Sequence, residues 1–267
     1  MSGRISRLHQ GAGRAIVLLA VAAVALQLAF VLRLAAMVAI DPQSTTFQRT
    51  EAWRLAVAGD GGRWRQRWVD ETRISPHLKR AVIAAEDARF TGHSGVEWDA
   101  IEKAWEKNQR AESIADKAVL RAEEQAAARA ARGLPPREPA PARAARIVGG
   151  STITQQLAKN LLLGGERTLL RKGEELVLAV ALEALLDKRR ILEIYLNSVE
   201  WGDGVFGAEA AAQHYFRTDA GRLSARQAAQ LAVMLPAPKR FEKRPGSAYV
   251  QGRAATIVAR MADVELP

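Results

Sequence analysis

The chain has 267 residues, 48% of them apolar and 25% charged, and this composition excludes wholesale disorder and fibrous proteins. The absence of cysteine excludes disulfide scaffolds, thiol catalysis and cysteine-based zinc or iron–sulfur sites. Lysine and arginine outnumber aspartate and glutamate by 39 to 29. The net charge of +10 favours anionic partners such as nucleic acid, lipid headgroups or phosphorylated substrates.

The N-terminal region contains a long apolar stretch. Residues 15–32 are interrupted only by Gln27, and after Arg33 the apolar run resumes as far as Ile40. This length predicts an uncleaved transmembrane anchor over residues 15–40, with Arg33 reaching toward an interface. The alternative is a cleavable signal peptide, but its apolar region is only ~7–15 residues long and a small-residue cleavage site should follow it.

Three arginines, Arg4, Arg7 and Arg14, precede the apolar stretch. The positive-inside rule therefore places residues 1–14 in the cytoplasm as a short tail. The rest of the chain is then expected on the far side of the membrane, as a juxtamembrane segment over 41–66 and one domain over 67–267.

The start of the domain is rich in tryptophan and arginine. Residues 63–68 alternate arginines with Trp64 and Trp68, and Trp53 precedes them. Alternating cations and amphipathic rings suit the headgroup layer of a membrane. The alternative is a solvated basic connector with one or two tryptophans in the core, and both interpretations stay open.

Helical patterns dominate the rest of the chain, and strict alternation of apolar and polar residues is scarce. Ser75 and Pro76 are typical of an N-cap and a first helical position, and they predict a helix through Phe90. Further helices are predicted over 151–163, 168–190, 191–197 and 209–216, and a last one begins with the capping-box pattern 224–227 and ends before Pro236 and Pro238. The fold class is therefore all-α, mainly helical.

Residues 106–146 differ from their surroundings because they are rich in alanine and proline and poor in large aliphatic residues. Such a stretch cannot bury enough apolar surface to fold by itself. We interpret it as a mobile insertion within the domain.

Glu86 is the first candidate for chemistry. It follows Leu78 and Val82 at four-residue spacing, so the three side chains share one helix face. A carboxylate at the end of an apolar stripe loses solvation, which raises its pKa and suits it to proton transfer near neutral pH. The alternative is that Glu86 turns to solvent or pairs with Arg89.

A second cluster occupies residues 149–160. Its glycine pair precedes Ser151 at a predicted helix start, where free backbone N–H groups favour an anion. Four polar side chains then follow at helical spacing, and their hydrogen-bond donors suit a sugar or a phosphate. These residues are Thr152, Gln155, Gln156 and Lys159. A plain solvated helix face has the same composition, so this alternative stays open.

Two further patterns follow. Arg171 and Glu175 are spaced as an i,i+4 pair, which is either a surface ion pair worth ~0.3–0.5 kcal/mol or a carboxylate among cations that neutralise a diphosphate. Residues 188–197 precede the glycine-rich run 201–207. Glycines at this density predict a turn-rich loop whose backbone closely approaches another segment.

Together these patterns resemble the monofunctional biosynthetic peptidoglycan glycosyltransferases, relatives of the glycosyltransferase domain of class A penicillin-binding proteins. The first family motif, Glu-Asp-x-x-Phe-x-x-His-x-Gly, corresponds to residues 86–95. The second, Gly-Gly-Ser-Thr-x-Thr-Gln-Gln-x-x-Lys-Asn, is complete over 149–160. The third, Arg-Lys-x-x-Glu, is 171–175, and the fourth, Ile-Leu-Glu-x-Tyr-Leu-Asn, is 191–197.

The resemblance implies a lysozyme-like transglycosylase domain behind a single transmembrane helix, which would place the helix in the cell inner membrane and the catalytic domain in the periplasm. It implies that lipid II is polymerised into β-1,4-linked glycan with inversion at the anomeric carbon and release of undecaprenyl diphosphate. It assigns Glu86 as the base and Glu175 as the second catalytic carboxylate, facing one cleft. By the same resemblance the substrate-binding residues are Asp87, Phe90, His93, Gly150, Ser151, Thr152, Thr154, Gln155, Gln156, Lys159, Asn160, Arg167, Arg171, Lys172, Glu193, Tyr195 and Asn197.

The chain departs from the family pattern at two places. Glu97 stands where the family usually has aspartate, and the 106–146 insertion is longer than the usual segment before the second motif. No cofactor is expected to be required. Family members are often helped by magnesium, but this sequence shows no dedicated metal-ligand spacing, so a metal site stays open.

Three other functions compete with this one. A lysozyme-type hydrolase would also use a helical glutamate, but it has no diphosphate for the basic cluster to bind. A non-catalytic membrane scaffold is disfavoured by the intact carboxylates, and a nucleic-acid-binding protein by the predicted topology. The expected partners are lipid II, the growing glycan strand and the membrane, with other cell-wall synthesis or division proteins as candidates and no nucleic acid.

Overall fold

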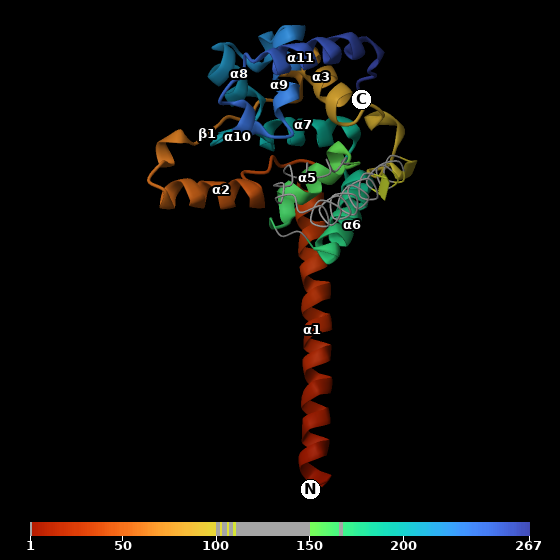
Figure 1. Cartoon of the computed structure of the whole chain (residues 1–267). Coiled ribbons are helices and arrows are strands. Elements are labelled where there is room, and N and C mark those ends of the chain that lie inside the picture. The colour runs from red at the N-terminus through yellow and green to blue at the C-terminus, as the bar shows by residue number, and fades with distance from the viewer. Residues whose placement is uncertain (1, 100–101, 103–105, 107–108, 111–149, 166–167) are drawn as a thin grey trace, which may run out of the picture. The chain divides into compact units, whose positions relative to one another are not determined.

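The computed structural model describes residues 2–99, 102, 106, 109–110, 150–165 and 168–267. The chain divides into two units, one formed by Met1–Val96 with Thr152–Pro267 and the other by Glu97–Ser151. Most of the predicted insertion, together with Gly149 and Arg167, lies outside the described residues. The first unit carries the fold and is mainly helical, which confirms the predicted class (Figure 1).

The chain begins with the long helix α1 (Ser2–Ala36). Its part Arg14–Ala36 is long and apolar enough to cross a membrane. The helix ends four residues before the predicted Ile40, and residues 37–39 form a turn. Leu34 and Met37, on either side of this end, are buried in the domain core. Arg33 donates a hydrogen bond to the carbonyl of Ser44 at 2.9 Å, so it binds the link that follows the helix.

Helix α2 (Thr46–Val57) was not predicted from the sequence. A capping box between Thr45 and Gln48 starts it, and the same glutamine donates to the carbonyl of Ser198 at 3.2 Å. Thr46 donates to the carbonyl of Leu161 at 2.9 Å. These contacts attach α2 to the domain that follows it in sequence.

The tryptophans of the 63–68 run pack into the domain. The ring of Trp64 lies 4.7 Å from that of Phe206, and Arg190 lies over the partly buried ring of Trp68. Trp53, by contrast, is 73% exposed. The structure therefore favours the interpretation of residues 63–68 as a connector with tryptophans in the core.

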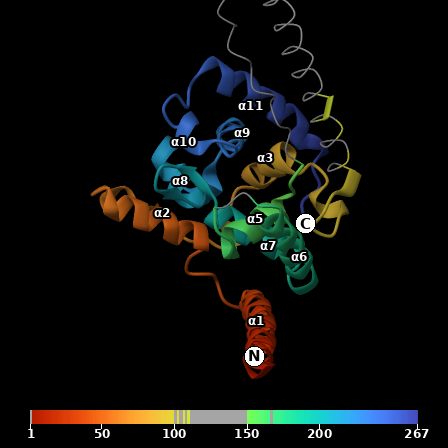
Figure 2. The same cartoon turned by 60° about the horizontal axis from the view of Figure 1, so that its bottom comes forward.

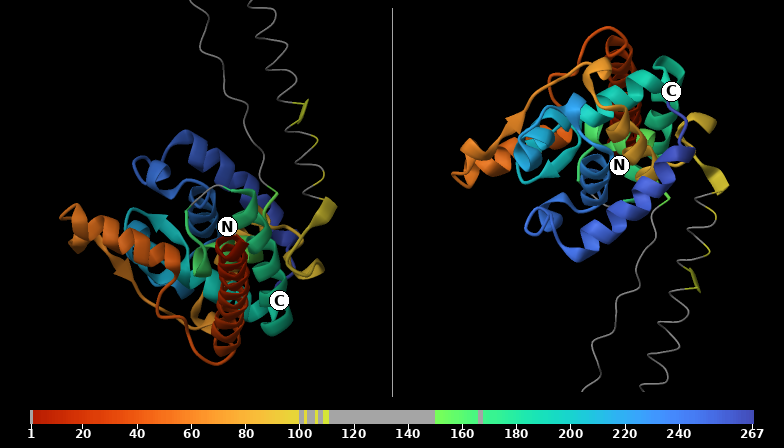
Figure 3. Two further views of the ribbon diagram at one scale, coloured as in Figure 1. Left: turned by 90° about the horizontal axis from the view of Figure 1, so that it is seen from below. Right: turned by 90° about the horizontal axis from the view of Figure 1, so that it is seen from above.

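The core is formed by two groups of helices. In one group α9 (Ala225–Met234) packs against α3 (Pro76–Glu86) and α11 (Ala248–Arg260); Figure 3 shows α11 in dark blue beside α9. In the other, α5 (Ile153–Leu162) packs against α6 (Leu169–Leu185) and α7 (Lys188–Ser198), as Figure 2 shows. Fully buried leucines from both groups belong to one hydrophobic cluster.

The predicted helix bounds agree with the structure only in part: α3 begins at Pro76 as predicted but ends at Glu86, four residues before the predicted Phe90. The capping box between Ser224 and Gln227 starts α9 as predicted. The predicted helix over 168–190 is wrong at its end, because Asp187 caps a new helix, α7, after a break at Leu186. Helix α11 was not predicted. The described residues also form α8 (Ala208–Phe216) and α10 (Pro238–Phe241).

A small sheet joins the segment before α3 to the segment between α7 and α8. Strand β3 (Val205–Phe206) pairs in parallel with β1 (Arg65–Gln66) and antiparallel with β2 (Glu200–Gly202). Gly204 has φ +79°, and an added Cβ would lie 2.8 Å from the carbonyl oxygen of Arg63. The glycine-rich run is thus a turn with close backbone approaches, as predicted.

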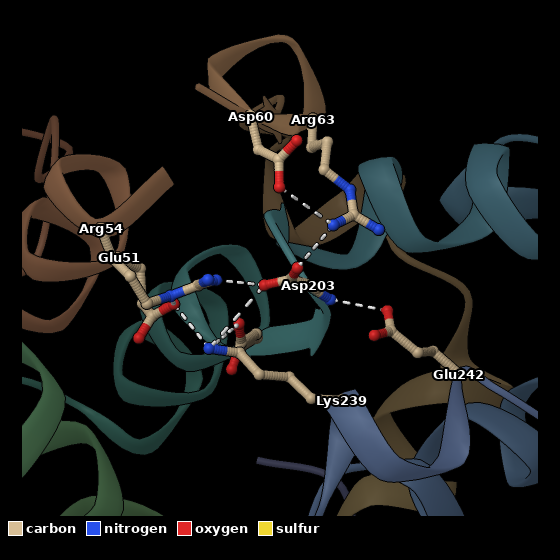
Figure 4. Close-up of polar contacts among 8 residues, drawn as sticks. Glu51, Arg54, Asp60, Arg63, Asp203, Lys239 and Glu242 are labelled. Carbon is tan, nitrogen blue, oxygen red and sulfur yellow. Dashed lines mark hydrogen bonds and ion pairs between the residues drawn. The ribbon is translucent and has the colours of Figure 1, made fainter. Parts of the chain in front are cut away.

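A network of charges links α2, the sheet and α10 (Figure 4). The ammonium of Lys239 lies 2.5 Å from Glu51, 3.4 Å from Glu200 and 3.9 Å from Asp203. Asp203 also pairs with Arg54, and with Arg63 at 3.0 Å. Burial of Glu200, which is 6% exposed, raises its pKa to about 7. This network ties the helix after α1 to the second half of the domain.

Candidate active site

Glu86 is the last residue of α3. Ser75 caps this helix by accepting a hydrogen bond from the backbone N–H of His77, and Pro76 follows at its first position. Leu78 and Val82 are fully buried, so the apolar stripe faces the core as predicted. Glu86 is partly buried at the end of this stripe.

The carboxylate of Glu86 meets two groups from helix α5. Its Oε2 accepts a hydrogen bond from Nε2 of Gln156 at 2.8 Å. Burial raises the pKa of Glu86, and the neighbouring charge of Asp87 acts in the same direction, whereas the Gln156 hydrogen bond and the charge of Lys159 oppose it. The net shift is upward, as a proton acceptor working near neutral pH requires.

Helix α5 places Gln156 at this point through its own start. Thr152 is the N-cap, and it forms a capping box with Gln155. The Thr152 hydroxyl also donates to the carbonyl of Gly95 at 2.6 Å, which joins the second motif to the end of the first. Tyr195 of α7 donates to Oε1 of Gln156 at 3.0 Å from the other side.

Asp87 forms a second link between the first two motifs. Its Oδ2 accepts a hydrogen bond from the backbone N–H of Ile153, the first residue of α5, at 3.0 Å. The Nε2 of His93 lies 2.9 Å from Oδ1 of Asp87, while the Nδ1 of His93 accepts from the backbone N–H of Gly95. These contacts hold the start of α5 against the end of α3, where Glu86 lies.

Several other motif residues are buried and contact neighbouring helices. Thr154 is fully buried and donates to Glu183 of α6 at 2.5 Å. Lys188 pairs with the same carboxylate at 2.7 Å and lies 4.5 Å from the ring centre of the buried Phe90. Glu183 was not predicted from the sequence, because its contacts come from other helices and leave no local pattern.

Glu175 lies on α6 and is 3% exposed. One of its oxygens accepts a hydrogen bond from Arg171 at 3.0 Å, and the other accepts one from Lys172. Glu175 is therefore a buried carboxylate between two cations. It is not the surface ion pair that was the alternative interpretation of the i,i+4 spacing. The Nε of Arg171 is buried and has no hydrogen-bond acceptor among the described residues.

Glu193 and Asn197 of α7 contact the segment that precedes α3. Glu193 accepts from the backbone N–H of Glu71 at 2.9 Å. Asn197 is fully buried and bonds both the N–H and the carbonyl of Val69 at 2.9 Å. These two motif residues thus fix residues 69–71, whereas Tyr195 between them faces Gln156.

Four predicted site residues remain to be located. Gly150 and Ser151 belong to the second unit, as does Glu97. Arg167 lies outside the described residues, and Asn160 is partly exposed at the side of α5.

A cavity of about 500 Å³ lies elsewhere, where α6 and α7 meet the link after α1. Its lining consists of Val38, Glu71, Leu185, Leu186, Asp187, Arg189, Arg190 and Glu193. Glu193 is the one predicted site residue in this lining, and there it pairs with Arg190 at 2.7 Å. Because neither Glu86 nor Glu175 lines this cavity, we do not place the reaction in it.

The comparison with known families agrees with the motifs. A family model described as Transglycosylase matches residues 55–117 and 139–262. The chain belongs to the transglycosylase family. The match begins within α2 and reaches η5, the 3₁₀ turn Met261–Asp263 that follows α11, so it covers every site residue discussed above.

Individual relatives carry a more specific name. The chain is 52% identical over 244 residues to the biosynthetic peptidoglycan transglycosylase of Burkholderia thailandensis, covering 91% of this chain and 82% of that protein. It is 46% identical over 242 residues to that of Herminiimonas arsenicoxydans, with 91% of each chain covered. For the relative of Bordetella pertussis the identity is 49%, over 85% of this chain and 82% of the other. The enzyme is thus a peptidoglycan glycosyltransferase.

Proposed function

We propose that the enzyme polymerises lipid II into β-1,4-linked glycan strands with inversion at the anomeric carbon, releasing undecaprenyl diphosphate. The observation that carries this proposal is the environment of Glu86: a partly buried carboxylate with a raised pKa, held by Gln156 close to Lys159. The shared description of the relatives as biosynthetic transglycosylases supports chain extension over cleavage.

In the proposed step Glu86 is the general base. The 4-hydroxyl oxygen of the acceptor sugar forms a bond to C1 of the donor, and its proton passes to the Glu86 carboxylate. The bond between C1 and the phosphate oxygen breaks, and its electron pair leaves on the diphosphate. Attack opposite the departing group turns the α-linked diphosphate into a β-glycosidic link.

The departing diphosphate needs positive charge. Lys159 lies near Glu86, while Arg171 and Lys172 bind Glu175 on α6, which packs against α5. Preorganised cations at the position where charge develops lower the barrier of such a step. We propose that Glu175 orients Arg171 and Lys172 toward the diphosphate and faces the same cleft as Glu86.

The arrangement around Glu175 does not fit a resident divalent cation. Both of its oxygens already accept hydrogen bonds from cations. The described residues hold one group of three carboxylates able to share an ion, formed by Glu51, Glu200 and Asp203, and the ammonium of Lys239 lies among them. We derive no step of the reaction through a metal.

We also propose that α1 anchors the enzyme in the cell inner membrane, with the catalytic domain in the periplasm. Gln27, within the apolar part of α1, donates to Glu174 of α6 at 3.4 Å. Helix α6 also exposes Leu170 and Val177, seven residues apart on one face, by 81% and 62%. A polar contact along the candidate span and an exposed apolar face beside it support the proposal that the start of α6 lies within the outer half of the bilayer.

One experiment tests the reaction. The purified full chain is incubated with labelled lipid II in detergent, and glycan polymer and undecaprenyl diphosphate are measured. We expect β-1,4-linked polymer and one released diphosphate for each link formed. Cleavage of preformed glycan without polymer would support the hydrolase, and binding of lipid II without any product would support a scaffold; either result contradicts the proposal.

A further inference from the structure

Three side chains from three helices form a continuous hydrogen-bonded chain that ends at Glu86. The hydroxyl of Tyr195 on α7 donates to Oε1 of Gln156 on α5, and Nε2 of Gln156 donates to Oε2 of Glu86 on α3. The two distances are 3.0 Å and 2.8 Å. Tyr195 is fully buried, so its hydroxyl lies away from bulk solvent.

The direction of this chain depends on the tyrosine. A glutamine amide has a donor end and an acceptor end of nearly the same shape, and only the hydrogen-bond partners decide which end points where. Burial raises the pKa of Tyr195 well above its usual value, so the phenol keeps its proton. A protonated phenol that donates to Oε1 leaves Nε2 facing Glu86.

We propose that Tyr195 is a positioning residue for the glycosyl transfer. It fixes the Gln156 amide with its N–H toward Glu86 and acts through Gln156 without touching the substrate. This inference rests on the proposed role of Glu86 as the base. It gives Tyr195 a different role from the substrate contact expected from the resemblance.

The arrangement affects how easily Glu86 ionises. An N–H donor stabilises the charged carboxylate, whereas an amide oxygen turned to the same place would repel it. The other groups that act on Glu86 are Asp87, which favours the protonated acid, and Lys159, which favours the carboxylate. Loss of the tyrosine hydroxyl therefore leaves fewer molecules with an ionised base at a given pH.

The test is a pH profile of the full-length Tyr195→Phe enzyme with labelled lipid II. Activity needs ionised Glu86. We therefore expect the acidic limb of the pH profile of kcat/KM to move to higher pH by about 0.5–1 unit, as the loss of one hydrogen bond implies. At a fixed pH on this acidic limb we expect kcat to fall about 3–10-fold, which is the same shift expressed as a rate, and KM to change by less than about 2-fold.

Tyr215→Phe is the matched control. Its hydroxyl donates to the carbonyl of Trp201 at 2.9 Å. The change therefore also removes one phenol hydrogen bond, but this bond does not involve Gln156 or Glu86. We expect this control to have the pH profile of the unmodified enzyme. Equal thermal unfolding of both variants shows that any difference in profile does not arise from lost folding.

A double-mutant cycle tests whether Tyr195 acts through Gln156. If it does, Gln156→Ala alone moves the acidic limb in the same direction, and adding Tyr195→Phe changes it no further. An unmoved profile in Tyr195→Phe, or fully additive effects in the cycle, would overturn the inference. Glu86→Gln tests the premise separately: if that variant polymerises at the rate of the unmodified enzyme, Glu86 is not the base and the inference loses its ground, whereas absence of polymer from the unmodified enzyme would refute the proposed function itself.

Discussion

The side chain of Asp87 accepts a hydrogen bond from the backbone N–H of Ile153 at 3.0 Å, although the two residues are 66 positions apart in sequence. The contact joins the end of α3 to the first turn of α5. Because Glu86 directly precedes Asp87 and Gln156 lies about one helical turn after Ile153, it also sets their separation. Asp87 is 5% exposed, so the bond is shielded from water.

Asp87→Ala is expected to destabilise the domain by about 1–3 kcal/mol, because it leaves a buried N–H and the His93 ring without an acceptor. Thermal unfolding of the full chain in detergent measures the change. Asp60→Ala is the control, since Asp60 is half exposed and its ion pair with Arg63 spans 3.6 Å. Equal melting temperatures for the two variants would contradict the structural role of Asp87.

The Lys239 network predicts a pH-dependent stability. The pKa of Glu200 is raised from 4.5 to about 7 in the folded chain, so the folded state binds its proton more tightly than the unfolded state. This contribution is fully present below about pH 4.5 and is lost as the pH rises through 7, by about 3 kcal/mol at most. Glu200→Gln should therefore be more stable than the unmodified chain at pH 8 and nearly equal at pH 4.5.

Denaturant unfolding at several pH values between 4 and 8 measures this difference. Glu265→Gln, at an exposed position, is the control and should follow the unmodified chain throughout. If Glu200→Gln shows the same pH dependence as the unmodified chain, Glu200 is not the group responsible.

Gly207 precedes α8 with φ +83°, and an added Cβ would lie 2.7 Å from the carbonyl oxygen of Asn197. Gly207→Ala is expected to cost about 2 kcal/mol or more and to disturb the α7 residue that binds Val69. Gly252→Ala is the matched control, because Gly252 lies inside α11 with open space around it and should gain about 0.4–1 kcal/mol. Unfolding curves of both variants test whether the free energy of unfolding falls for Gly207→Ala and rises for Gly252→Ala.

How much of this fold follows from sequence depends on the element. Helices α5 and α9 carry capping boxes and regular apolar spacing, and both were predicted. Helix α2 was missed because its buried residues, Gln48, Glu51 and Leu55, include two polar side chains that bind distant parts of the domain. The sheet was missed because strands of two or three residues are too short to show alternation.

The site shows a similar division. The motifs placed Glu86 at the end of an apolar stripe, and its burial follows from that pattern. The bonds of Gln156 to both Glu86 and Tyr195 join three helices and leave no local trace in the sequence. The same is true of the Asn197 amide, which binds the backbone of Val69 instead of facing outward.

The position of α6 beside α1 predicts contact with lipid. Because the chain contains no cysteine, one nitroxide can be attached at a single introduced cysteine. In the full chain in liposomes, a label at Val177→Cys should be reached readily by oxygen and poorly by a water-soluble nickel complex. A label at Tyr249→Cys on α11, 56% exposed, should show the reverse. Two equally water-accessible labels would exclude the immersion of α6.

The most direct test of the account is the polymerisation rate of Glu86→Gln on labelled lipid II, with lipid II binding measured on the same sample. The amide keeps the size of the side chain but cannot accept the acceptor's proton. We predict a rate at least about 100-fold lower, as expected on removal of a general base, with binding unchanged. Polymer made at the rate of the unmodified enzyme would contradict the assignment of Glu86 as the base.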